Sequence, residues 1–339
     1  MQSAHWFTNM SLERGRRMNK RFFYIVKPMV PRAMQLFLRR FLVRRALKKH
    51  AKTWPIYPGS EAKPENWHGW PNGKKFAFIL THDVDTQKGH DASIALMELE
   101  KTLGFVSSFN FVPKRYRVSE EVRNIIAENG FEIGVHGLTH DGKLFSSRKI
   151  FEHRCAQINM FLKEWSAVGF RAPSMIRNLD WIKEFDIEYD ASTFDTDPFE
   201  PQPENMGTIF PFWISAQDIG KNGYVELPYT LCQDFSLLIL LGNKDNSVWK
   251  SKLDFIAKNG GMALINTHPD YMNFSKGPSK PEEYPVSLYS DFLSYVKNTY
   301  AENYLNIVPK DLARFYKKNY VDPGNAQGKT DFAAHNERP

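Results

Sequence analysis

Two aspartates and two histidines are the residues in this chain whose types and spacing are best suited to chemistry. Asp83 and Asp85 stand one residue apart at the end of an apolar run, in the sequence KKFAFILTHDVD. His136 and His140 stand four residues apart after another apolar run, in VHGLTHD. Imidazole is the commonest metal ligand, and two histidines with one carboxylate leave a catalytic zinc ion an open position. The pattern therefore indicates a metal centre that activates water.

Two further polar residues follow apolar runs in the same way. Arg171 lies in GFRAPS and His268 lies in INTHPD. The carboxyl ends of parallel strands converge on one face of a barrel, so these residues are expected to meet the aspartates and histidines there. Each also has a structural explanation when taken singly. An aspartate can end a turn, His140 can cap a helix, and Arg171 can pair with a surface acid.

The positioning elements follow from the alternation of apolar runs and helical patterns between Phe76 and Lys318. Strands are expected at 76–81, 106–112, 131–135, 167–170, 187–189, 224–227 and 262–266. Helices are expected at 92–103, 119–130, 147–165, 178–185, 247–258, 287–300 and 310–318. This alternation predicts βαβ units with a parallel sheet or barrel. The segment 195–217 breaks the pattern and is expected to be an irregular loop with a short hairpin.

Composition divides the chain into four parts. Residues 1–52 form a basic N-terminal segment, 53–73 a Pro- and Gly-rich linker or lead-in loop, 74–318 the catalytic domain and 319–339 a polar tail. The first part holds 14 Lys and Arg and one acid, Glu13, a net charge of +13; the whole chain carries +7, so the remainder is at −6. A mildly acidic catalytic body argues against a nucleic-acid substrate, because phosphate recognition needs a basic surface.

The basic segment contains a helical pattern of apolar residues, from Met34 to Leu42, interrupted by arginines. Such a helix could lie on an anionic membrane surface, or be a solvated arm, or pack on the domain. The sequence shows no transmembrane span and no signal-peptide pattern. Two cysteines, Cys155 and Cys232, cannot form a disulfide framework. We therefore expect a cytoplasmic protein, peripheral at most to the inner face of the membrane. The oligomeric state is left open.

Five ordered motifs between 76 and 316 resemble those of the NodB-homology polysaccharide deacetylases, carbohydrate esterase family 4. They are THDVD, HGLTH, RAP, YDAS at 189–192 and INTHPD. The resemblance implies a distorted (β/α)7 barrel and a metal-dependent N-deacetylase. It implies that Asp85, His136 and His140 bind a divalent metal, most simply zinc, with cobalt or nickel as alternatives. The implied partner is an N-acetylated carbohydrate of a surface polysaccharide or its precursor.

The same resemblance implies roles for the remaining residues. Asp83 would be the general base, His268 the general acid, and Arg171 would orient Asp83. An acid of the fourth motif would partner His268. Asp190 matches that motif best, and Asp195 and Asp197 are alternatives.

The chain also departs from the family pattern. Val84 stands where a second aspartate is usual, so the metal aspartate falls one residue later, as in branches with a DVD-type motif. Gly137 stands where Ser or Thr is usual, and the segment 195–217 would reshape the sugar groove.

Other functions fit part of the pattern. Hydrolysis of another C–N bond, by a sugar deformylase or a cyclic-amide hydrolase, is the second hypothesis. Two histidines and a carboxylate also describe non-haem iron oxygenases. The βα alternation and the additional Asp83, Arg171 and His268 argue against that class. The last alternative is a non-catalytic carbohydrate-binding relative. The complete set of base, metal ligands and acid argues against it.

Overall fold

The computed structural model describes residues 32–275 and 277–322, and the chain forms two compact units, 1–49 and 50–339. In the first unit the described part is one helix, α2 (Arg32–Lys49). Among the described residues, no helix is both long enough and apolar enough to cross a bilayer. Most of the predicted tail, 323–339, lies outside the described residues, as do 1–31.

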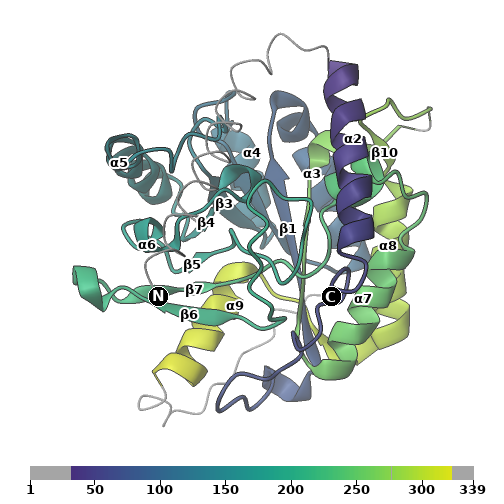
Figure 1. Cartoon of the computed structure of the whole chain (residues 1–339). Helices are drawn as coiled ribbons and strands as arrows, with labels where there is room; N and C mark the ends of the chain where they lie inside the picture. Colours follow the sequence, from purple (N-terminus) through teal and green to yellow (C-terminus); the bar gives the residue numbers. More distant parts are fainter. Residues whose placement is uncertain (1–31, 276, 323–339) are drawn as a thin grey trace, which may run out of the picture. The chain divides into compact units, whose positions relative to one another are not determined.

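The second unit is built on a curled, mostly parallel sheet (Figure 1). Its order is β11-β1-β2-β3-β4-β5-β7-β6, and β8 pairs with β1. β6 runs antiparallel to β7, and the other pairs are parallel. The strands are β1 (Phe76–Val84), β2 (Ser107–Phe111), β3 (Glu132–His136), β4 (Gly169–Arg171), β5 (Tyr189–Asp190), β6 (Phe212–Ser215), β7 (Gly223–Glu226), β8 (Met262–Thr267) and β11 (Tyr304–Leu305). Every strand expected from the sequence overlaps one of these.

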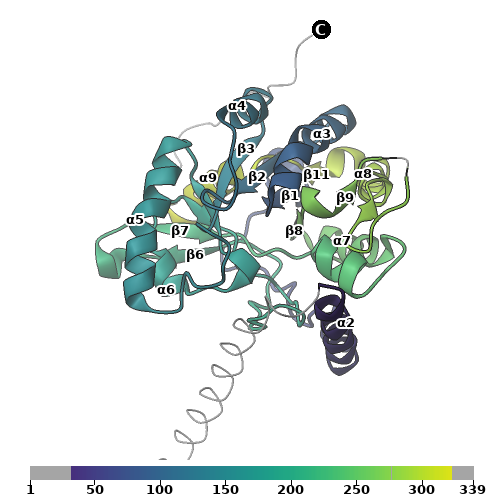
Figure 2. The same cartoon turned by 90° about the horizontal axis from the view of Figure 1, so that it is seen from above.

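Helices cover the outside of the curled sheet, as Figure 2 shows from above. They are α3 (Gln87–Leu103), α4 (Glu120–Glu128), α5 (Arg148–Glu164), α6 (Leu179–Ile182), α7 (Ser247–Asn259), α8 (Ser287–Tyr300) and α9 (Pro309–Tyr316). Side-chain caps define two of the starts: Ser119 accepts a hydrogen bond from the amide of Val122, and Ser147 accepts one from Ile150. These caps satisfy amides that the first helical turn leaves unpaired.

Strand β1 is buried along its whole length and pairs with β2, β8 and β11. Successive side chains of a strand point to opposite faces. Phe78 faces the helices, where its ring lies 6.0 Å from that of Phe292 on α8. Ala77 and Ile79 belong to the core enclosed by the sheet. By the same alternation Asp83 points into the enclosed side, and His82 points to the helices.

The sheet curls until its two sides meet. Segment 229–231 provides the contact through two isolated parallel bridges, Phe194 with Tyr229 and Leu231 with Ile265. A curled parallel sheet with helices outside is the arrangement that the distorted barrel predicts, so the fold class is confirmed.

The Pro- and Gly-rich residues 53–73 pack against this unit. The ring of Trp54 lies 5.1 Å from that of Phe199, and the indole of Trp70 donates to the carbonyl of Gly260 at 2.9 Å. The segment 195–217 is mostly irregular, and its one strand, β6, forms the expected hairpin with β7. Three short strands were not expected. β11 pairs with β1, and β9 (Met272–Asn273) and β10 (Tyr284–Pro285) form a separate pair.

Candidate active site

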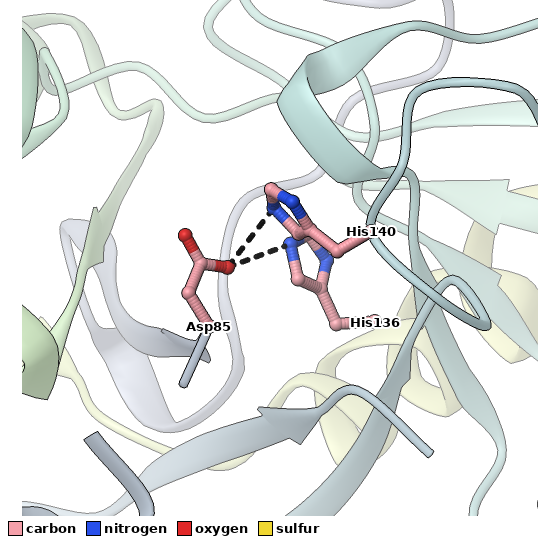
Figure 3. Close-up of side chains that lie close together, drawn as sticks. All are labelled: Asp85, His136 and His140. Carbon is pink, nitrogen blue, oxygen red and sulfur yellow. Dashed lines mark ion pairs between the residues drawn. The ribbon is translucent and has the colours of Figure 1, made fainter. Parts of the chain in front are cut away.

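Asp85, His136 and His140 lie together beyond the carboxyl ends of β1 and β3 (Figure 3). The Oδ1 atom of Asp85 is 3.0 Å from Nε2 of His140 and 3.4 Å from Nε2 of His136. Ligand atoms bound tetrahedrally at zinc distances of about 2.0–2.1 Å lie roughly 3.3 Å apart. The spacing of the three residues therefore fits a shared divalent ion.

The hydrogen bond of His136 supports the same conclusion. Its Nδ1 faces the carbonyl oxygen of Arg171 at 3.1 Å, and a carbonyl can only accept, so Nδ1 carries the proton. With Nδ1 as the donor, Nε2 is directed at the Oδ1 of Asp85, and a cation, either a proton or a metal ion, must lie between these two atoms. A backbone carbonyl that holds Nδ1 as the donor is typical of metal-ligating histidines.

Asp85 is anionic in this environment. Burial raises the pKa of its carboxyl, but His140 and His136 outweigh burial and hold that pKa well below its usual range. Its backbone amide donates to Oδ2 of Asp270 at 2.9 Å. Gly89 allows this contact, because a Cβ there would lie 2.1 Å from the same oxygen. Asp270, part of the INTHPD motif, thus holds the loop that carries Asp85.

The turn that carries both histidines explains the unusual glycine. Gly137 has φ +60°, and a Cβ at this position would lie 2.4 Å from Cγ of Pro173. A serine or threonine here would be strained in backbone and in space. His140 also has a positive φ, +55°, so the turn uses an uncommon conformation to aim its imidazole at Asp85.

Asp83 lies beside this cluster, with Oδ2 3.7 Å from Nε2 of His136. Its Oδ1 accepts hydrogen bonds from Asn110 at 3.0 Å and from Arg171 at 3.2 Å. Its Oδ2 accepts one from Asn266 at 2.8 Å. The contact between Arg171 and Asp83 is the one that the sequence predicts, whereas the two asparagines were not anticipated.

These contacts set the charge of Asp83. Burial raises the pKa of its carboxyl, but the charges of His136, Arg171 and His268 outweigh burial and lower that pKa to about 2. The guanidinium of Arg171 is itself buried and also contacts Thr81, Asn266 and the carbonyl of Ala191. Asp83 is therefore a fixed carboxylate at neutral pH.

His268 is paired with Asp234. Its Nδ1 lies 2.6 Å from Oδ1 of Asp234, and its backbone amide donates to Oδ2 at 2.8 Å. Tyr284 donates to the same Oδ2 at 2.8 Å. Burial lowers the pKa of His268, but Asp234, helped by Asp85 and Asp83, raises it to about 10.

The expectation that Asp190 partners His268 is thus wrong. Ser192 donates to Asp190 at 2.6 Å, and the other oxygen of Asp190 faces Glu226. Asp195 pairs with Lys252, and Asp197 accepts from Tyr229 at 2.8 Å. Asp190 ends β5 and the other two candidates follow it, whereas the partner of His268 comes from the segment after 229–231. The one sequence signal for Asp234 is its place directly before the apolar run FSLLIL.

His82, although adjacent to Asp83, lies outside the site. Its Nε2 is 2.8 Å from Oε1 of Glu100 on α3, and its Nδ1 is 2.8 Å from Oγ1 of Thr267. Ser107 and Tyr289 also donate to Glu100. This buried network ties the helix-facing side of β1 to its neighbours.

No protein-family model matches the sequence, and no curated protein matches it. Solved structures do match. A protein assigned as a polysaccharide deacetylase from Mycobacterium smegmatis has a TM-score of 0.58 and 18% identity, covering 82% of this chain and 99% of that chain. Another, from Pseudomonas aeruginosa PAO1, has a TM-score of 0.56 and 13% identity over 78% of this chain and 99% of that chain. The fold is that of the polysaccharide deacetylases.

A structure described as an allantoinase has a similar fold. The Puue allantoinase has a TM-score of 0.55 and 14% identity, over 78% of this chain and 98% of that chain. Fold alone therefore leaves the substrate open, and the function has to be argued from the site.

Proposed function

We propose that this protein is a metal-dependent hydrolase that removes N-acetyl groups from an amino sugar of a surface polysaccharide or its precursor. The proposal rests on one observation: Asp83 and His268, whose pKa values are shifted in opposite directions, lie beside the cluster of Asp85, His136 and His140. Asp83 is held as a carboxylate and His268 as an imidazolium. A base and an acid with pKa values driven apart are the two groups that amide hydrolysis needs.

Asp85, His136 and His140 would hold the divalent ion, for which we propose zinc, with cobalt or nickel as alternatives. Such an ion, when bound, polarises an amide carbonyl and makes water more acidic. Asp83 accepts the proton of the attacking water, because Arg171, Asn110 and Asn266 fix its position and leave it ionised. The oxygen of that water forms the new bond to the acyl carbon.

His268 supplies the second proton. The C–N bond of the amide breaks as the leaving nitrogen takes the proton from His268, so that acetate and a free amine are formed. Asp234 orients the imidazole through Nδ1, which leaves Nε2 for the donation. Water is the only co-reactant, and both catalytic groups return to their starting states after proton exchange with solvent.

A cyclic amide is the second candidate substrate, because the allantoinase shares the fold. A ring-opening hydrolysis uses the same base and acid and releases no acetate. Removal of a formyl group from a sugar would likewise release formate instead.

The test combines metal content with acetate release from N-acetylated amino-sugar polymers, short oligosaccharides and nucleotide sugars. Asp85→Ala should lose both metal and activity. Asp83→Asn should keep the metal and lose turnover by roughly 10²–10⁴-fold, the range expected for a general base.

Two results would count against the proposal. Equal loss of metal from both variants would contradict the separate roles of Asp83 and Asp85. Bound metal without acetate from any substrate would favour the cyclic amide or formyl substrates, and an absence of metal in the wild type would favour a non-catalytic carbohydrate-binding protein.

A further inference from the structure

Helix α2 carries a row of large apolar side chains that are exposed. They are Met34 at 49%, Phe37 at 69%, Leu38 at 49%, Phe41 at 61% and Leu42 at 61%. At 100° per residue these positions occupy one side of the helix, within an arc of roughly 140°. Elsewhere in the described chain the large exposed hydrophobic residues, Met160 and Ile219, stand singly. A contiguous exposed row of this kind marks an interaction surface.

The same helix is strongly cationic. It contains no acidic residue, and its basic residues are Arg32, Arg39, Arg40, Arg44, Arg45, Lys48 and Lys49. By the helical angle, Arg45, Lys48 and Lys49 fall on the same side as the apolar row. That side is therefore divided along its length, apolar from Met34 to Leu42 and basic from Arg45 to Lys49.

We propose that this side of α2 docks on the surface of an anionic lipid bilayer. The apolar half would enter the boundary between headgroups and acyl chains, and the basic half would contact lipid phosphates. Since α2 is not a membrane-spanning helix, the contact is peripheral. The proposal is independent of the proposed hydrolase activity.

Two other binding partners, a nucleic acid and a second copy of the chain, would each match only one half of this surface. A nucleic acid would pair with the cations but would gain little from exposed Phe37 and Phe41. A second copy of the chain could cover the apolar row, but it would bring an all-basic helix against another one. An anionic bilayer is favourable for both halves.

The experiment is flotation of the full-length protein with vesicles. Wild type is expected to float with vesicles of phosphatidylcholine and phosphatidylglycerol, and much less with phosphatidylcholine alone. Phe37→Ser/Phe41→Ser should weaken binding roughly tenfold for each ring, because each loses the burial of a large apolar side chain. Arg45→Gln/Lys48→Gln should weaken it roughly fivefold for each charge and reduce its dependence on salt.

Met160→Ser is the matched control, since it removes an exposed apolar side chain from α5. It should bind vesicles as wild type does. Circular dichroism shows whether each variant keeps its fold. Unchanged flotation of Phe37→Ser/Phe41→Ser, or equal binding to neutral and anionic vesicles, would overturn the proposal. A lipid-free dimer that the same variant dissociates, without vesicle binding, would assign the surface to a second copy.

Discussion

Asp83 and Asp85 are separated by a single residue, yet their surroundings give them different chemistry. Asp83 accepts hydrogen bonds on both oxygens from neutral amides and a guanidinium. Asp85 instead faces two imidazole nitrogens. These contacts agree with the roles proposed above, proton transfer for Asp83 and ion binding for Asp85. The single residue between them matters, because the alternation of β1, continued one residue past its end, puts both aspartates on one face and Val84 on the other.

At the residue scale, two buried aspartates can be compared directly: Asp234, which pairs with His268, and Asp190, which does not. Asp234→Asn should lower kcat by roughly 10²–10⁴-fold, because the imidazole loses the carboxylate that orients it and holds its proton. Asp190→Asn should leave kcat close to that of the wild type, since Asp190 contacts Ser192 and Glu226 instead. The measurement is the pH dependence of kcat for both variants.

Thermal unfolding of the two variants provides the control. A loss of turnover in Asp190→Asn at unchanged melting temperature would contradict this division. So would full activity in Asp234→Asn, because the neutral side chain of asparagine cannot supply the charge that the carboxylate places beside Nδ1 of His268.

At the element scale, the turn between β3 and α5 positions both histidines. Gly137→Ala should destabilise the protein by about 1–3 kcal/mol, because the backbone has a positive φ and the added methyl meets Pro173. Metal affinity should fall at the same time, since His136 and His140 flank the turn. Chemical denaturation and metal titration measure the two effects.

Gly130→Ala is the comparison for this variant. Gly130 also has a positive φ, +84°, but nothing lies within 4 Å of a Cβ added there. It should lose stability through backbone strain alone and keep its metal affinity. Equal metal affinities in both variants would mean that the contact with Pro173 does not control the histidines.

At the scale of the whole molecule, stability is linked to pH through a buried carboxyl pair. The carboxyl groups of Asp190 and Glu226 interact, and Oδ2 of Asp190 and Oε2 of Glu226 accept no hydrogen bond from any other described residue. Burial and the charge of Asp190 raise the pKa of Glu226 well above its usual value. The folded pair therefore keeps a proton that the unfolded chain releases.

The sign follows from linkage. The contribution of Glu226 to the free energy of unfolding is fully present below the pKa of about 4.5 that this group has in the unfolded chain. It is lost as the pH rises through the pKa of Glu226 in the folded protein, by up to about 1.4 kcal/mol for each pH unit. Glu226→Gln should remove the part of the decline that comes from Glu226, because its amide can donate to Asp190 and its oxygen can still accept from Thr193. Burial also raises the pKa values of Glu132, Asp195 and Asp197, so the slope should become smaller but not vanish. Urea unfolding between about pH 5 and 8 measures it. Glu302→Gln, at a fully exposed side chain, should keep the wild-type slope.

Much of this molecule can be predicted from its sequence. The strands that carry Asp83, His136, Arg171 and His268 show apolar runs that end in polar residues, and parallel pairing brings such ends together. Asp234 escapes prediction because it follows no regular strand. Asp190 is misleading because it does end a strand, but its side chain is held by Ser192 and Glu226. The sequence pattern locates strand ends, while side-chain partners across the barrel depend on packing.

The closure of the barrel has a consequence for how such a molecule can diversify. Asp83 and the histidines lie on or beside β1 and β3, which have continuous ladders of backbone hydrogen bonds. Segment 229–231, just before Asp234, joins the sheet through isolated bridges and through the hydroxyl of Thr230, which donates to Met262 and accepts from Leu264. Insertions near such a junction disturb few ladder bonds, so loop length can change there at low cost. The length of the chain at this junction can therefore change while Asp85, His136 and His140 keep their places at the ends of β1 and β3.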